Sequence, residues 1–175
     1  MIEWKPRRCA GAYFNGDFFE IDTQSGYRMF TADPLYEGII LAPNASNSEL
    51  GDAVKTCLRQ SRFLPTPELR GDLLVATRYV KAAEEWAAKM VLQFKYKNKT
   101  ALYNKMHTCE IEELDSIISI ASNIHDKLMN WTATREMEAS KITVPSNSSA
   151  EELGAALRAG FKACSGRGSD VLEKL

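Results

Sequence analysis

Two stretches of the chain, SNSELGDAVKTCLRQS at residues 46–61 and SAEELGAALRAGFKAC at residues 149–164, are versions of one segment separated by 103 residues. Five of their sixteen positions are identical, where average composition gives about one chance match. These identities are Ser46/Ser149, Glu49/Glu152, Leu50/Leu153, Gly51/Gly154 and Ala53/Ala156. The apolar stretches 39–41 and 142–144 precede them at the same spacing. We therefore predict a repeated strand, polar loop and helix over residues 39–62 and 142–165.

Each copy begins with the pattern S-x-x-E, which is typical of a capping box at a helix N-terminus. Apolar residues then recur at helical spacing, so each helix is expected to bury one stripe. Glycine inside a helix costs about 1 kcal/mol relative to alanine. Its presence in the same turn of both copies, at Gly51 and Gly154, predicts a close approach of backbones there.

The remaining elements are predicted from local patterns. Asn15-Gly16 between aromatic runs predicts a hairpin over residues 11–22, followed by strands at 26–30 and 37–42. A longer helix contains Trp86, and Thr66-Pro67 fits its N-cap and first position. Alternation over 104–113 predicts a strand that turns at Leu114-Asp115 into a partner strand at 116–122. A further strand at 141–145 leads into the second capped helix, and the segment 166–170 is expected to end that helix.

These elements predict an α+β fold with a mostly antiparallel sheet or sheets, two repeated capped helices and one longer helix. The 175 residues fit one domain spanning 1–175, and 45% hydrophobic with 26% charged residues is the balance of a globular protein. Lys and Arg total 22 and Asp and Glu total 23, so no overall charge attracts nucleic acid or anionic membranes. Any polyanionic or polycationic partner must be bound by a local patch.

The chain is expected to be cytoplasmic. Its N-terminus is charged and lacks the apolar run of about 7 or more residues found in secretory signals. No run of about 18 apolar residues predicts a membrane-spanning helix. The four cysteines form no C-x-x-C pair, and we expect them to be reduced and buried.

No catalytic residue, cofactor or metal site is predicted. The motifs G-x-S-x-G, G-x-x-x-x-G-K-[ST] and G-x-G-x-x-G are absent from the sequence. His107 and Cys109 share a strand face, but two ligands fall short of the four of a structural zinc site. As a catalytic dyad they would need a lowered thiol pKa, which leaves an unrecognised hydrolase as a distant alternative.

Two charged segments could bind a partner. Lys95, Lys97, Lys99 and Lys105, interleaved with Tyr96 and Tyr103, could form a strip for single-stranded nucleic acid, and this is the main alternative function. The acidic segment EIEELD at 110–115 has the opposite charge and could attract a basic protein.

The stretches YKNKTALYNKMHTCEIEE, NIHDKLMNW and VPSNSSAEELGAALRAGF occur in this order, and with them the chain resembles immunity proteins of bacterial contact-dependent growth inhibition (CDI) systems. The resemblance covers roughly residues 36–165, and the capped S-x-E-E-L-G helix after a short strand is its most specific part. It implies a small cytoplasmic protein, without catalysis, that binds the toxin domain of a large exoprotein, with one toxin domain per chain expected.

Many such toxins are nucleases with positively charged clefts, so the resemblance also implies inhibition by masking the toxin's active site. The family supplies no motif for the contact residues. From charge pattern alone, the candidate toxin-binding residues are Glu110, Glu112, Glu113 and Asp115, with Glu20 and Asp22 as further candidates. No membrane contact and no direct nucleic-acid contact are expected.

Overall fold

The structure is a computed structural model that describes residues 4–175. Its strands are β1 (Arg8–Phe14), β2 (Phe19–Gly26), β3 (Phe30–Ala32), β4 (Ile39–Leu41), β5 (His107–Leu114), β6 (Ile117–Ser122), β7 (Ile124–Lys127), β8 (Asn130–Thr132), β9 (Ile142–Pro145) and β10 (Ser165–Gly166). Its helices are α1 (Asn47–Gln60), α2 (Pro67–Arg70), α3 (Ala76–Gln93), α4 (Lys99–Tyr103), α5 (Arg135–Ala139), α6 (Ala150–Ala163) and the 3-10 helix η1 (Ser169–Lys174).

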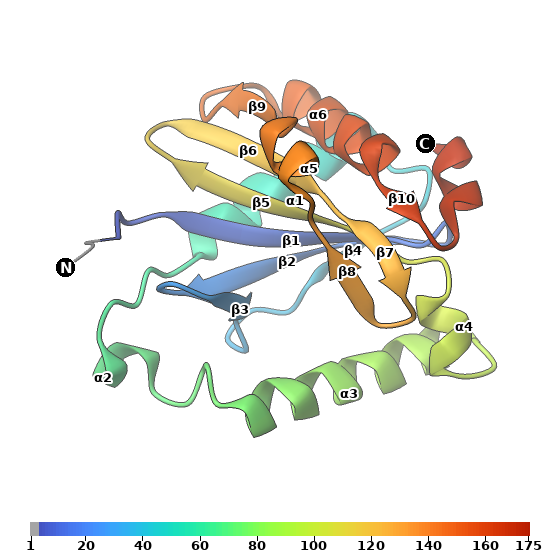
Figure 1. The fold of residues 1–175 in the computed structure, drawn as a ribbon, viewed down its shortest axis with the longest axis horizontal. Helices are drawn as coiled ribbons and strands as arrows, with labels where there is room; N and C mark the ends of the chain where they lie inside the picture. Colours follow the sequence, from blue (N-terminus) through green and yellow to red (C-terminus); the bar gives the residue numbers. More distant parts are fainter. Residues whose placement is uncertain (1–3) are drawn as a thin grey trace.

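The main sheet lies between two helical layers (Figure 1). Its strand order is β3-β2-β1-β5-β6-β9, β4 also pairs with β2, and every pairing in it is antiparallel. Helices α1 and α6 pack on one face through a core that contains Phe14, Phe19 and Phe161. Helix α3 lies along the other side, where a second core joins it to α4 and the β7–β8 hairpin. The predicted α+β fold is confirmed.

The internal repeat is larger than the helices that revealed it. The segment β1-β2-β4-α1 has the same order and pairing as β5-β6-β9-α6, and the two halves meet where β1 pairs with β5. Ile21 pairs with Ile39 in the first half, and Ile120 pairs with Ile142 in the second. The hairpin, the edge strand and the helix of one segment each therefore have a counterpart in the other.

The two repeated helices contact each other at their glycines, as predicted. A Cβ atom on Gly51 would collide with the carbonyl oxygen of Ala150, and one on Gly154 would collide with that of Asn47. Lys55 on α1 donates to the Ser148 carbonyl before α6 at 2.6 Å, and Arg158 on α6 donates to the Ala45 carbonyl before α1. These two contacts are equivalent in the two copies of the repeat. The glycines therefore let α1 and α6 cross at backbone contact.

Both capping boxes are confirmed. The amide of Glu152 donates to the Ser149 hydroxyl at 3.2 Å, and the Glu152 carboxylate accepts from the Ser149 amide at 2.7 Å. Ser46 and Glu49 make the same contacts in α1.

Replacing Ser149 with alanine is expected to lower the free energy of unfolding by about 1 kcal/mol, because amides at the N-terminus of α6 lose their acceptor. Urea denaturation followed by circular dichroism measures the change. The Ser149→Asn variant keeps a capping oxygen and should stay close to the original protein. Equal stability of Ser149→Ala and the original protein would contradict the role of this cap.

Several predicted boundaries are wrong for local reasons. The first hairpin has a four-residue loop, 15–18, because Phe14 pairs with Phe19. The predicted strand at 26–30 is mostly a turn, closed by Tyr27 donating to the Met29 carbonyl. The turn between β5 and β6 falls at Asp115–Ser116, where both residues have positive φ, one position later than predicted.

The helix boundaries also differ from the prediction in two places. Thr66-Pro67 does cap a helix, but this is the short α2, and α3 begins separately at Ala76. Helix α6 ends at Ala163, before the segment 166–170. Gly166 instead belongs to β10, which pairs in parallel with β7, and residues 169–170 begin η1. No helix within residues 4–175 is long and apolar enough to cross a membrane.

Candidate functional site

Four of the six candidate carboxylates share the sheet face opposite α1 and α6. Gly11 on β1 pairs with Asp22 on one side and with Glu110 on the other. Glu20 and Glu112 lie two residues away on the same strands, so they point to the same face. We call this set, Glu20, Asp22, Glu110 and Glu112, the acidic face.

Gly11 lets one of these carboxylates lie over the neighbouring strand. The amide of Gly11 donates to Oδ1 of Asp22 at 2.8 Å, and a Cβ atom on Gly11 would collide with that oxygen. The hydroxyl of Tyr13 donates to the other carboxylate oxygen at 3.3 Å. The carboxylate of Asp22 is therefore held above β1, on the acidic face.

The acidic face is only partly neutralised by the chain itself. Glu112 forms an ion pair of 3.1 Å with Arg7, whose guanidinium lies 4.9 Å from the ring centre of Trp4 and 5.0 Å from that of Phe30. Within residues 4–175, Glu20, Asp22 and Glu110 form no ion pair. The acidic face therefore carries three carboxylates that form no ion pair with the described residues.

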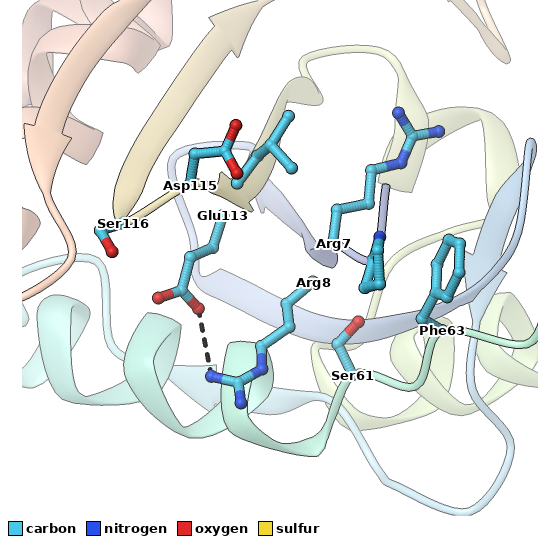
Figure 2. Close-up of a pocket in the computed structure, with 9 residues that line it drawn as sticks. Arg7, Arg8, Ser61, Phe63, Glu113, Asp115 and Ser116 are labelled. Carbon is cyan, nitrogen blue, oxygen red and sulfur yellow. Dashed lines mark hydrogen bonds and ion pairs between the residues drawn. The ribbon is translucent and has the colours of Figure 1, made fainter. Parts of the chain in front are cut away.

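The other two candidates lie elsewhere, beside a surface pocket of about 370 Å³ at the β5–β6 turn. Figure 2 shows Glu113 and Arg8 pointing toward one another, with 3.4 Å between their charged atoms, while Arg7 points away from them. Asp115, at the turn, pairs with Lys5 at 2.7 Å. The basic N-terminal segment thus neutralises Glu113 and Asp115.

Beside the acidic face lies a cleft of about 610 Å³ between β2, the β3–β4 region and α3. Only Ala87 and Met90 of α3 are buried, and both pack in the second core. The earlier turns of the helix contribute exposed residues, among them Ala82 and Ala83, to the cleft wall. The cleft also contains Glu20 and Asp22.

Burial changes the acidity of both carboxyl groups in the cleft. It raises the pKa of Glu20 to about 7, helped by the charge of Asp22 and opposed by the Trp86 hydrogen bond and Lys89. Burial also raises the pKa of Asp22 to about 6, against the hydrogen bonds that it accepts. Trp86 Nε1 donates to both oxygens of Glu20, at 2.8 and 2.7 Å. A cation brought into the cleft would favour the charged form of both groups.

The other candidate groups have structural environments. His107 is fully buried, which lowers its pKa, and burial raises the pKa of the Cys109 thiol. Cys109 lies 3.8 Å from Cys164, and all four cysteines are buried and free. No three metal-ligating side chains come together in the part of the chain that the structure describes. A raised thiol pKa is the opposite of what a thiolate dyad needs.

The lysine and tyrosine strip does not present stacking surfaces. Tyr103 is buried, and the half-buried Tyr96 donates its hydroxyl to Asp17 at 2.6 Å. Lys99 pairs with Glu84 and Lys105 pairs with Asp170. Single-stranded nucleic-acid sites combine a free basic groove with exposed rings, and this strip offers neither in full.

Sequence reasoning missed three groups that shape the site. Arg7, just before β1, pairs with Glu112 on β5. Trp86 lies in the predicted longer helix, but the sequence gives no sign that its indole nitrogen donates to Glu20 on the sheet. Trp131 lies on β8, an element that was not predicted, and lines the cleft. Local patterns hold no signal for such contacts between distant segments.

The acidic face and the cleft bring carboxylates and aromatic rings together on one side of the sheet. The sequence matches the CDI immunity protein family, CdiI, over residues 8–164, so the chain belongs to this family. Immunity protein CdiI-YPIII of Yersinia pseudotuberculosis serotype O:3 (strain YPIII) is 34% identical over 168 residues, which cover 90% of this chain and 95% of that protein.

Two solved structures share the fold. One is the CdiA-CT/CdiI toxin and immunity complex from Yersinia pseudotuberculosis, in which the matching chain has a TM-score of 0.86 and 31% identity, covering 93% of this chain and 99% of that one. The other is the protein of unknown function NMB0488 from Neisseria meningitidis, with a TM-score of 0.84, 28% identity and coverage of 94% and 99%. The family resemblance found in the sequence is confirmed.

Proposed function

We propose that this chain binds the CdiA-CT toxin domain of its own CDI system in the cytoplasm, one toxin domain per chain, and blocks the toxin's active site without catalysis of its own. The related Yersinia pseudotuberculosis complex joins a toxin to an immunity protein of this fold. The acidic face is the observation that carries the proposal, because its unpaired carboxylates suit the basic cleft of a nuclease.

All six candidate residues remain in the proposal, with different roles. The acidic face contacts the toxin directly, and Glu110 is its exposed, unpaired member. Glu113 and Asp115 pair with Arg8 and Lys5, so they contribute less charge to a partner. Charged residues at an interface steer association and exclude wrong partners, while aromatic anchors supply more of the affinity.

The test is expression of the adjacent toxin domain in the same cells with and without this chain. We expect growth only when the chain is present, co-purification at equal amounts, and intact cellular RNA and DNA. Failure of the original chain to protect cells or to co-purify would contradict the proposed function. If the chain protects the cells but the purified complex still cleaves nucleic acid, masking of the active site is contradicted.

A charge reversal locates the contact surface. Glu110→Lys should weaken binding at least about tenfold, because it places a positive charge on the face that meets a basic toxin. The matched control is Glu173→Lys, which makes the same charge change at an exposed position of η1. Calorimetric titration measures both affinities, and equal affinities would exclude the acidic face as the contact surface.

A further inference from the structure

The cleft beside α3 combines aromatic rings with carboxylates. Tyr13, Trp86, Tyr103 and Trp131 form a row in which successive ring centres are 6.3, 6.0 and 6.1 Å apart. All four residues line the cleft together with Glu20 and Asp22. Aromatic faces attract ammonium and guanidinium groups, and carboxylates pair with them, so both features favour a cation.

Within residues 4–175 no side chain forms an ion pair with these carboxylates, and the nearest cation, Lys89, only partly offsets the rise in the pKa of Glu20. Glu20 is only 4% exposed, and within residues 4–175 its side chain accepts hydrogen bonds from Trp86 alone. The two cationic residues of the cleft wall have other partners, since Arg78 pairs with Asp72 and Lys89 pairs with Glu37 at 3.5 Å. A buried carboxyl group without a countercharge is poorly stabilised in its charged form.

The rim of the cleft indicates a protein surface as the source of the cation. Tyr79 on α3 and Met129 in the β7–β8 turn line the cleft and are 39% and 59% exposed. A free ion would leave these side chains in water, whereas a docked protein would cover them. A cleft of about 610 Å³ also falls within the size range of sites that enclose whole groups.

We propose that the cleft receives one arginine or lysine side chain from the toxin domain, which pairs with Glu20 and Asp22 and lies against Trp86. This proposal rests on the proposed function and specifies the anchor of that interface. The exposed part of the acidic face then guides the toxin toward the cleft, and the buried Glu20 and half-buried Asp22 hold the inserted side chain.

The proposal makes toxin affinity depend on pH. The groups that face Glu20 are Tyr13 on β1, Asp22 on β2, Trp86 and Lys89 on α3, and Tyr103 on α4. In the free protein the pKa of Glu20 is about 7, and an inserted cation lowers it. Below about pH 7, binding must therefore displace the proton of Glu20. The affinity for the toxin should fall about tenfold between pH 8 and pH 6.

The experiment measures the dissociation constant of the complex between the full chain and the toxin domain by calorimetry at pH 6, 7 and 8. Glu20→Gln should weaken binding about 30-fold or more at pH 8 and flatten the pH dependence, because the amide cannot ionise. The amide can still accept from Trp86, so the variant keeps this contact. Thermal unfolding checks that it is folded.

A second variant blocks the cleft without touching a carboxylate. Ala83→Trp places an indole in the cleft from α3 and should also weaken binding about 30-fold or more. The matched control Ala88→Trp makes the same change at an exposed position of α3 outside the cleft, and should bind like the original chain. Double-mutant cycles with each arginine and lysine of the toxin should then identify one residue that couples to Glu20.

The outcomes separate the two proposals. If the original chain does not bind the toxin domain, the proposed function and the cleft proposal both fail. If the original chain binds and Glu20→Gln and Ala83→Trp bind equally well, the cleft proposal is overturned while the proposed function stands. Weakening by Ala83→Trp with an unchanged Glu20→Gln affinity would show an apolar occupant and would also overturn it.

Discussion

Replacing Phe161 with alanine is expected to lower the free energy of unfolding by about 3–5 kcal/mol. Phe161 on α6 is fully buried against the rings of Phe14 and Phe19, with ring centres 5.8 and 5.7 Å away. The variant loses this aromatic contact and leaves a cavity between helix and sheet. Since a domain of this size has about 5–15 kcal/mol of net stability, the loss would take a large share of it.

Urea denaturation followed by circular dichroism measures this change, provided that the dependence on denaturant stays the same. Phe161→Leu is the matched control, because leucine keeps part of the buried volume and should lose less stability. A loss below about 1 kcal/mol for Phe161→Ala would show that this contact contributes little to the core.

Gly51→Ala and Gly154→Ala are each expected to destabilise the protein by about 1–3 kcal/mol, although alanine ordinarily stabilises a helix relative to glycine. The added methyl group would meet a backbone carbonyl of the facing helix, which cannot rotate away. Helices α1 and α6 must separate to accept it. Each glycine meets a backbone carbonyl of the other helix, so the two variants should lose similar amounts of stability.

The double variant tests whether both glycines serve one crossing. Its loss should be smaller than the sum of the two single losses, because the first methyl group already separates the helices. Asp52→Ala, at an exposed position of α1, is the control for helix propensity and should change stability by at most about 0.5 kcal/mol. Stabilisation by Gly51→Ala would contradict the close contact.

The features that the sequence predicted correctly are local or periodic. The capping boxes at Ser46 and Ser149 depend on residues three positions apart, and both form as expected. Alternation over 104–113 predicted the strand that forms β5, and the strand register places Glu110 and Glu112 on one face. The glycine repeat predicted close packing because two copies carried the same costly residue.

The features that the sequence missed depend on contacts between distant segments. Nothing near Glu20 or Asp22 shows that β1 lies between β2 and β5, so their shared face with Glu110 was not predicted. The ion pair between Arg7 and Glu112 arises from the same strand arrangement. The cleft exists because only the later turns of α3 pack in the core. Helical periodicity is the same along the whole helix, so it does not show which turns are packed.

The pairing of β1 with β5 also determines when protection becomes available during synthesis. Ala10 pairs with Ile111, and Gly51 lies against Ala150. The first half of the repeat therefore cannot complete its packing until the second half has been synthesised. At about 5–20 residues per second, the ribosome needs about 5–20 seconds to make the roughly 100 intervening residues. A nascent chain is therefore not expected to neutralise the toxin. A cell that receives toxin depends on the completed molecules that it already contains.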